Sequence, residues 1–237
     1  MSTVHFLQHR TEAEVLWFQR RQALQAASLW VAAGGWQGAL AQQRTNVVEM
    51  VGDVLVNGSN LERDKLIQTG DVIETGPRSR VSFVVGNASF HVRQNSRLQI
   101  ERGESVNFVS VMRLLTGAVV SVWGKGTNRR IVTPTVTAGI RGTGVYTEML
   151  DGQRSYFCNC YGTVDLSTTH AKTTSVAEYH ESFLAEPQEN GTVALRTSAA
   201  MNHTDAEVEF LATLIRQQTA WQIKVKKGAA TGDGYNG

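Results

Sequence analysis

The chain has few of the residues that mark several common classes of protein. Its 237 residues include two cysteines and three prolines. Two cysteines exclude a disulfide-stapled miniprotein, and scarce proline beside 22 glycines favours tight turns over stiff linkers. A net charge of +2 is too small for a nucleic-acid groove, so we expect no nucleic-acid partner. Because no apolar run reaches ~18 residues, a polytopic membrane protein is also excluded.

Sequence signatures of the common enzyme classes are missing as well. The chain contains no G-x-S-x-G, no H-E-x-x-H, no phosphate-binding loop and no dinucleotide fingerprint. We therefore predict a non-catalytic protein with no catalytic residues.

The N-terminal segment has the layout of an export signal. Arg20 and Arg21 precede a short, moderately apolar stretch at 23–33, and an A-x-A motif runs from Ala39 to Ala41. The arginine pair resembles a twin-arginine export signal. We expect cleavage after this motif, a periplasmic location and no stable transmembrane span afterwards. An uncleaved membrane anchor and an amphipathic helix of a cytosolic protein are the alternatives.

From about Asn46 onward, apolar and β-branched residues alternate with polar ones, which is the pattern of half-buried strands. The clearest runs cover 48–51, 54–56, 72–75, 80–85, 89–92, 98–100 and 117–123. The pattern predicts four glycine turns that each lead into a strand, at Gly52, Gly70, Gly117 and Gly162. The pattern predicts a mainly all-β protein, either a β-sandwich or a short, solenoid-like β-roll.

One helix is expected near the C-terminus. Thr204 and Glu207 have the spacing of a capping box. Four apolar residues then follow along one helical stripe, namely Val208, Leu211, Leu214 and Ile215. We predict a helix at about 204–218 that covers an open face or end of the sheet, followed by a flexible tail.

Three ordered motifs resemble the FecR family of periplasmic domains. The segment 133–145, T-P-T-V-T-A-G-I-R-G-T-G-V, is similar to that family's T-P-x-a-x-a-x-[VI]-R-G-T-x-[FV] signature. The segments 51–58 and 67–76 resemble the family's opening motifs. On this basis we place an export signal at 1–41, a FecR-like domain at 46–166 and a C-terminal extension at 167–237.

The resemblance implies a protein of envelope signal sensing, ligand binding or scaffolding. Some members couple an outer-membrane receptor to a sigma factor, and others are stand-alone envelope proteins. Here only 22 residues precede the apolar stretch, so we expect no cytosolic regulatory domain, which argues against anti-sigma activity. We expect an envelope protein or a cell-wall component as the partner.

The signature turn consists of Arg141, Gly142 and Thr143. Gly142 and Gly144 permit a bulge or a close backbone approach after the arginine. The Arg141 guanidinium can bond carbonyls or a carboxylate in the turn. We favour this structural role over ligand binding.

A C-x-C motif is the second informative site. Residues i and i+2 of a strand point to one face, so Cys158 and Cys160 would present two sulfurs together. With His180 and His203 they would form a tetrahedral set for zinc or another soft transition metal ion, with His170 in reserve. A strained or redox-active disulfide and ordinary buried thiols are the alternatives. The alternative function is thus a metal- or redox-carrying periplasmic protein.

Overall fold

A computed structural model gives the fold of most of the chain. It describes residues 45–62, 64–105, 107–126 and 129–225. The predicted export segment, including Ala39 and Ala41, lies outside the described residues. The described residues all belong to one compact unit. No helix in the described part is long and apolar enough to cross a membrane.

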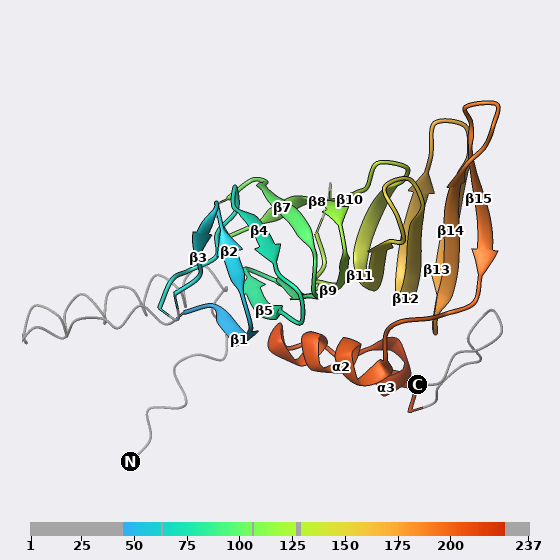
Figure 1. Cartoon of the computed structure of the whole chain (residues 1–237). Helices are drawn as coiled ribbons and strands as arrows, with labels where there is room; N and C mark the ends of the chain where they lie inside the picture. The colour runs from blue at the N-terminus through green and yellow to red at the C-terminus, as the bar shows by residue number, and fades with distance from the viewer. Residues whose placement is uncertain (1–44, 63, 106, 127–128, 226–237) are drawn as a thin grey trace, which may run out of the picture. The chain divides into compact units, whose positions relative to one another are not determined.

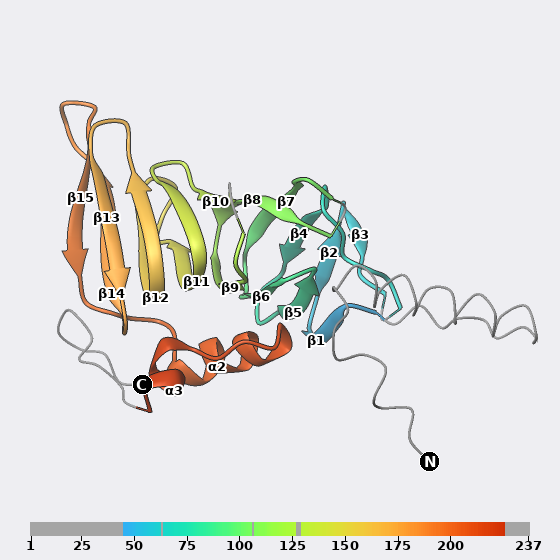
Figure 2. The ribbon, with the colours of Figure 1, turned by 180° about the vertical axis from the view of Figure 1, so that it is seen from behind.

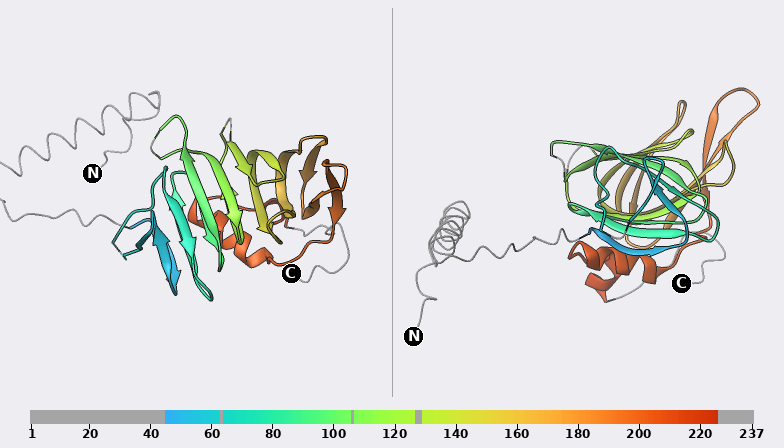
Figure 3. Two further views of the ribbon diagram at one scale, coloured as in Figure 1. Left: turned by 45° about the horizontal axis from the view of Figure 1, so that its top comes forward. Right: turned by 60° about the vertical axis from the view of Figure 1, so that its left-hand side comes forward.

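The described chain is mostly β, as predicted, with two helices near its C-terminus (Figure 1). All its strands belong to one sheet that curls over on itself, and Figure 2 shows the same sheet from behind. Neighbouring strands run antiparallel except β8 and β10, which run parallel. The strand pairing therefore gives two layers that face each other, an arrangement that Figure 3 shows from two further sides.

Each layer is an ordered series of strands. The first layer contains β3 (Ser59–Asn60), β2 (Val54–Val56), β4 (Val72–Thr75), β7 (Arg97–Arg102), β8 (Val109–Thr116), β10 (Arg129–Val132) and, beyond the connecting hairpin, β13 (Lys172–Ala177). The second contains β1 (Val47–Val51), β5 (Arg80–Val85), β6 (Ala88–Val92), β9 (Ala118–Trp123) and, beyond that hairpin, β14 (Glu181–Pro187) and β15 (Val193–Ser198).

A hairpin of two long strands, β11 (Thr137–Met149) and β12 (Ser155–Ser167), joins the two layers. The first part of β11 pairs with β10 and its last part pairs with β9. Strand β12 likewise pairs with β14 through its first part and with β13 through its last. Each long strand therefore passes from one layer to the other.

The hairpin bends at the signature turn. The register of β11 against β12 shifts between Arg141 and Gly144, which confirms the predicted bulge. Gly142 and Gly162 both have positive φ, at 64° and 98°. A Cβ at Gly162 would lie 2.6 Å from Cγ2 of Thr143, so this corner requires glycine.

The glycine turns are confirmed at three of the four predicted positions. Gly52, Gly70 and Gly117 have positive φ and stand shortly before a strand. The prediction for Gly162 is wrong, because this residue lies inside β12, where the strand changes its pairing partner from β14 to β13.

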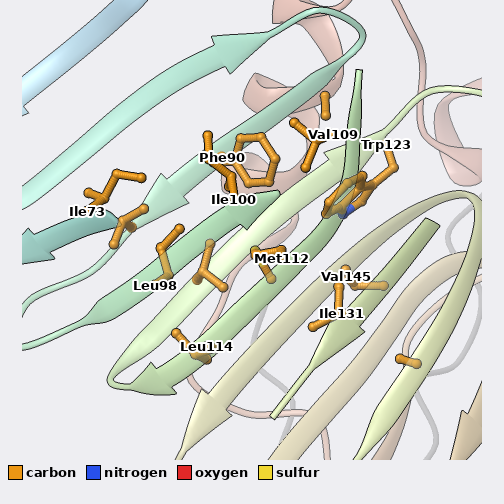
Figure 4. Packing of buried hydrophobic residues seen from close by; sticks show 14 of the residues in the cluster. Ile73, Phe90, Leu98, Ile100, Val109, Met112, Leu114, Trp123, Ile131 and Val145 are labelled. Atoms are coloured by element: carbon orange, nitrogen blue, oxygen red, sulfur yellow. The ribbon is translucent and has the colours of Figure 1, made fainter. Parts of the chain in front are cut away.

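The main core fills the space between the two layers (Figure 4). Both layers contribute to it, with Ile73, Leu98, Ile100, Met112, Leu114 and Ile131 from the first and Phe83, Phe90, Trp123 and Val145 from the second. Phe90 stacks on Phe83 at a centroid distance of 5.0 Å and meets the edge of Trp123 at 5.2 Å. Along each strand, side chains that point into this core alternate with side chains that point outward, as strand geometry requires.

The predicted C-terminal helix begins where expected and ends early. Helix α2 (Asp205–Leu214) starts with the predicted capping box, in which Thr204 Oγ1 accepts from the Glu207 N–H at 3.3 Å. The helix ends before the predicted residue 218 because Arg216 turns into the left-handed region, with φ of 58°. A second short helix, α3 (Ala220–Lys224), follows.

Helix α2 lies along the outer face of the second layer, where it contacts β6, β9 and β11. Ser89 Oγ donates a hydrogen bond to the Leu211 carbonyl at 2.8 Å, and Arg93 pairs with Glu207 at 2.6 Å. A second apolar cluster forms beneath the helices, and it includes Val120, Val122, Tyr146, Val208, Leu211 and Trp221. The second layer is therefore packed on both of its faces.

We expect Phe90→Ala to lower the free energy of unfolding by about 3–5 kcal/mol, because it leaves a cavity between the layers. The matched control is Phe210→Ala on α2, whose side chain is 42% exposed and whose loss should cost less than about 1 kcal/mol. Urea denaturation of the two variants measures both values. Equal losses would contradict the placement of the core.

Candidate metal centre

The structure brings the four predicted ligands together in one buried group. Cys158 and Cys160 lie on β12, His180 lies in the turn between β13 and β14, and His203 directly precedes the N-cap of α2. One possible ligand atom from each lies within 4.8 Å of all the others. These four residues are called the Cys2His2 cluster below.

Strand geometry places both sulfurs on the outer face of the second layer. Cys158 and Cys160 alternate with Phe157 and Asn159, so the two sulfurs share one side of β12. Both cysteines are free and fully buried, and they belong to the apolar cluster beneath α2 and α3.

His180 reaches the sulfurs because of an unusual backbone turn. Its φ is 25°, a positive value that a non-glycine residue rarely adopts. Its backbone N–H donates to the Cys160 carbonyl at 3.0 Å, which ties the turn to β12. The imidazole is thereby held over the C-x-C motif with no exposed surface.

A buried tyrosine hydroxyl positions the segment that carries His203. Tyr156 donates to the Ala199 carbonyl at 3.0 Å and accepts from the Met201 N–H at 3.0 Å. These bonds fix the chain just before His203. That histidine is buried, with 4% of its surface exposed.

Three of the distances within the Cys2His2 cluster lie near the edges of a tetrahedral site. Cys158 Sγ lies 3.5 Å from His180 Nδ1, and Cys160 Sγ lies 3.4 Å from His203 Nε2. The two imidazole nitrogens are 3.1 Å apart. Zinc bonds of ~2.3 Å to sulfur and ~2.0 Å to nitrogen, at tetrahedral angles, separate ligand atoms by about 3.3–3.8 Å. The residues present thus fit a zinc ion.

Each histidine also makes the second contact that metal-bound imidazoles usually make. His180 Nε2 lies 2.9 Å from Asp205 Oδ1, and His203 Nδ1 lies 2.8 Å from the Met201 carbonyl. A neutral imidazole has one N–H group, and these contacts place it on the side away from the sulfurs. The nitrogens that face the sulfurs then offer electron pairs to a cation.

Aromatic rings enclose the two imidazoles. Tyr146 stacks on His203 at 4.8 Å, and Trp221 stacks on His180 at 5.4 Å. Tyr179 meets the edge of His180 at 4.5 Å and donates its hydroxyl to Asp205 Oδ2 at 3.1 Å. This shell keeps water away from the cluster and holds the ligand rings in place.

The electrostatics of the cluster favour a bound cation. Burial alone would raise the pKa of the Cys158 thiol, but bonds from Cys160, His180 and His203 hold that pKa well below its usual value. Burial and the neighbouring Cys158 thiolate raise the pKa of Cys160 well above its usual value. Although burial lowers the pKa of His203, its bond to Cys158 raises that pKa overall. The lowered pKa of Cys158 favours its thiolate, which is the form of cysteine that binds a metal.

The other predicted site residues lie elsewhere. His170 is exposed on the β12–β13 turn and bonds Thr169 Oγ1 at 2.7 Å, so it takes no part in the cluster. Arg141 donates to the Asp165 carboxylate across the β11–β12 hairpin, with its side chain 68% exposed. Gly142 and Thr143 form the corner between the layers.

Sequence reasoning missed the residues that support the ligands. Asp205, Tyr179 and Trp221 all contact His180, yet none was singled out. For Asp205 a signal existed, because it is the second residue after His203 and begins the predicted helix. For the two aromatic residues only the tertiary packing reveals the contact.

Comparisons with known proteins do not assign this chain to a family. No protein-family profile and no curated protein matches the sequence. Two crystal structures of a candidate anti-sigma factor from Parabacteroides distasonis are similar at 8% identity, with TM-scores of 0.43 and 0.44. The matches cover 53% and 55% of this chain and 59% and 60% of those chains. The chain thus matches about three fifths of the length of those proteins.

Proposed function

We propose that this chain is a non-catalytic metal-binding protein whose Cys2His2 cluster holds one zinc ion. The observation that carries the proposal is the convergence of four buried ligand atoms within 4.8 Å. Two sulfurs and two imidazole nitrogens in tetrahedral arrangement are a preferred set for zinc. With all four positions supplied by the protein, the ion would have a structural role, because catalytic zinc keeps one position open.

The contacts of the sulfurs favour a metal over a redox-active disulfide. Each sulfur has an imidazole nitrogen within 3.5 Å, and each imidazole has a hydrogen-bond acceptor on its far side. A disulfide needs neither feature, and a C-x-C bridge along a strand lies at the upper edge of disulfide reach. A metal ion makes use of both features.

A second part of the proposal concerns where the protein acts. The motifs that resemble FecR domains fall on β1–β2, on β4 and on the β11 corner, which belong to one sheet. Together with the export-like N-terminal sequence, they support a FecR-like protein of the periplasm that takes part in envelope signal sensing, ligand binding or scaffolding. Its partner would be an envelope protein or a cell-wall component.

We expect the natively purified protein to contain one zinc ion per chain, measured by elemental analysis. Replacement of zinc by cobalt should give the visible absorption of a tetrahedral thiolate site. His180→Ala should abolish stoichiometric binding. His170→Ala is the matched control, because that histidine is exposed and outside the cluster, and it should bind as the native chain does. A metal-free native protein, or equal binding by both variants, would refute the site.

We expect Asp205→Asn to weaken zinc binding by about 10- to 100-fold, because an uncharged amide is a weaker hydrogen-bond acceptor than the carboxylate that orients His180. Competition against a chromophoric chelator measures the affinity. Asp165→Asn, which alters an exposed aspartate on β12, should leave the affinity unchanged. Equal affinities for native chain and Asp205→Asn would show that the carboxylate does not support the metal.

The proposed location predicts that the full-length protein, expressed in a bacterium with an active twin-arginine pathway, is recovered from the periplasm in a shortened form. The double variant Arg20→Lys, Arg21→Lys should remain in the cytoplasm at full length. Cell fractionation measures the location of the protein, and intact-mass measurement shows whether it has been cleaved. Full-length native protein in the cytoplasm would contradict export.

A further inference from the structure

The four ligands come from two structurally different sources. Cys158, Cys160 and His180 all belong to the sheet and its hairpin turns, whereas His203 lies in the segment that follows the last strand. We call residues 199–225, which contain this histidine and both helices, the cap. A metal in the cluster would therefore bond the cap to the sheet.

The cap also closes the site. Trp221 of α3 stacks on His180, and its indole N–H donates to Glu209 of α2 at 2.6 Å. Asp205, the first residue of α2, bonds the same histidine on its far side. Since all four ligands are buried, with the sheet on one side and the cap on the other, an ion would leave only when the cap moves.

Apart from the cluster, hydrogen bonds and buried apolar contacts hold the cap to the sheet, among them the bonds of the Tyr156 hydroxyl to Ala199 and Met201. Another is the buried bond from Ser89 Oγ to the Leu211 carbonyl, and a third is the partly buried Arg93–Glu207 pair. Val208 and Leu211 add buried apolar contact. Helix α2 has ten residues, and isolated helices shorter than about 12–15 residues are marginal in water. An undocked cap would consequently lose its helical structure.

We propose that the cap is locked by the metal, so that zinc binding and the docking of α2 and α3 stabilise each other. This inference rests on the proposed zinc site. By linkage, the factor by which zinc favours docking equals the factor by which docking raises the affinity for zinc. When zinc is lost, the cap opens and uncovers the outer face of the second layer, including Val120, Val122 and Tyr146. The metal thereby controls which surface the protein presents.

Hydrogen exchange of the full chain, read by mass spectrometry with zinc and after chelation, tests the lock. We expect the amides of α2 to exchange at least about 10-fold faster without zinc, while those of β5 and β6 keep their protection. Stoichiometric zinc with unchanged exchange in α2 would overturn the lock and leave the zinc site intact. Equal loss of protection throughout the chain would also overturn it, since zinc would then hold the whole fold. A native chain that binds no zinc would overturn the proposed function itself.

The reverse direction is tested with variants at residues that supply no ligand atom. Ser89→Ala removes the bond to Leu211, and Trp221→Ala removes the ring over His180. We expect the rate at which zinc passes to an excess of chelator to be at least about 5-fold higher for each of these two variants than for the native chain. Phe210→Ala, on the exposed side of α2, is the control and should release zinc at the native rate. Native release rates in both cap variants would refute the proposal.

Discussion

The pairing of β11 with β12 is the constraint on which the rest of the described structure depends. These two 13-residue strands are the only ones in the described chain that pair with strands of both layers. The strands before them in the chain join β11 through β9 or β10, and those after them join β12 through β13 or β14. The bend at Gly142 and Gly162 therefore decides how the layers face each other, and with it the shape of the main core.

The second layer has apolar packing on both faces, and the Cys2His2 cluster follows from that. All six residues of β9 are buried, inward against the core and outward against α2. The Cys2His2 cluster and Asp205 are buried at the second apolar cluster, beneath the helices. Burial of such polar groups costs free energy unless they are paired. Hydrogen bonds satisfy the outer sides of the histidines. On their inner sides the sulfurs and nitrogens lie 3.1–3.5 Å apart, and a cation would bind them there.

The local features of this fold could be predicted from the sequence, because they depend on neighbouring residues. Period-two alternation located strands such as Arg80–Val85, the Thr204 capping box located the start of α2, and the C-x-C spacing put two sulfurs on one face. His180 and His203 were chosen by ligand type alone. Their approach to the sulfurs depends on the β13–β14 turn and on the return of the chain after β15, which no short-range pattern encodes.

The errors in the sequence prediction have the same origin. Gly162 has the local features of a turn glycine, yet it lies inside a strand because β12 must change layers there. The helix was extended beyond Leu214 because its apolar stripe continues to Ile215, whereas the backbone reverses at Arg216 so that α3 can reach His180. Asp205 was read only as part of a helix start. For Gly162 and the helix end a tertiary contact overrode a locally sound pattern, whereas for Asp205 it added a role to a correct one.

The signature turn and the candidate metal site are consequences of the same few residues. The Arg141–Asp165 pair is exposed, and pairs of this kind contribute little to stability. The glycines and Thr143 instead shape the corner, since a Cβ on Gly162 would collide with Thr143. Cys160 is two residues from that corner on the same strand, so the direction in which its sulfur points depends on the bend. The motif that resembles FecR domains thus helps to shape the corner beside the strand from which the two cysteines of the candidate site project.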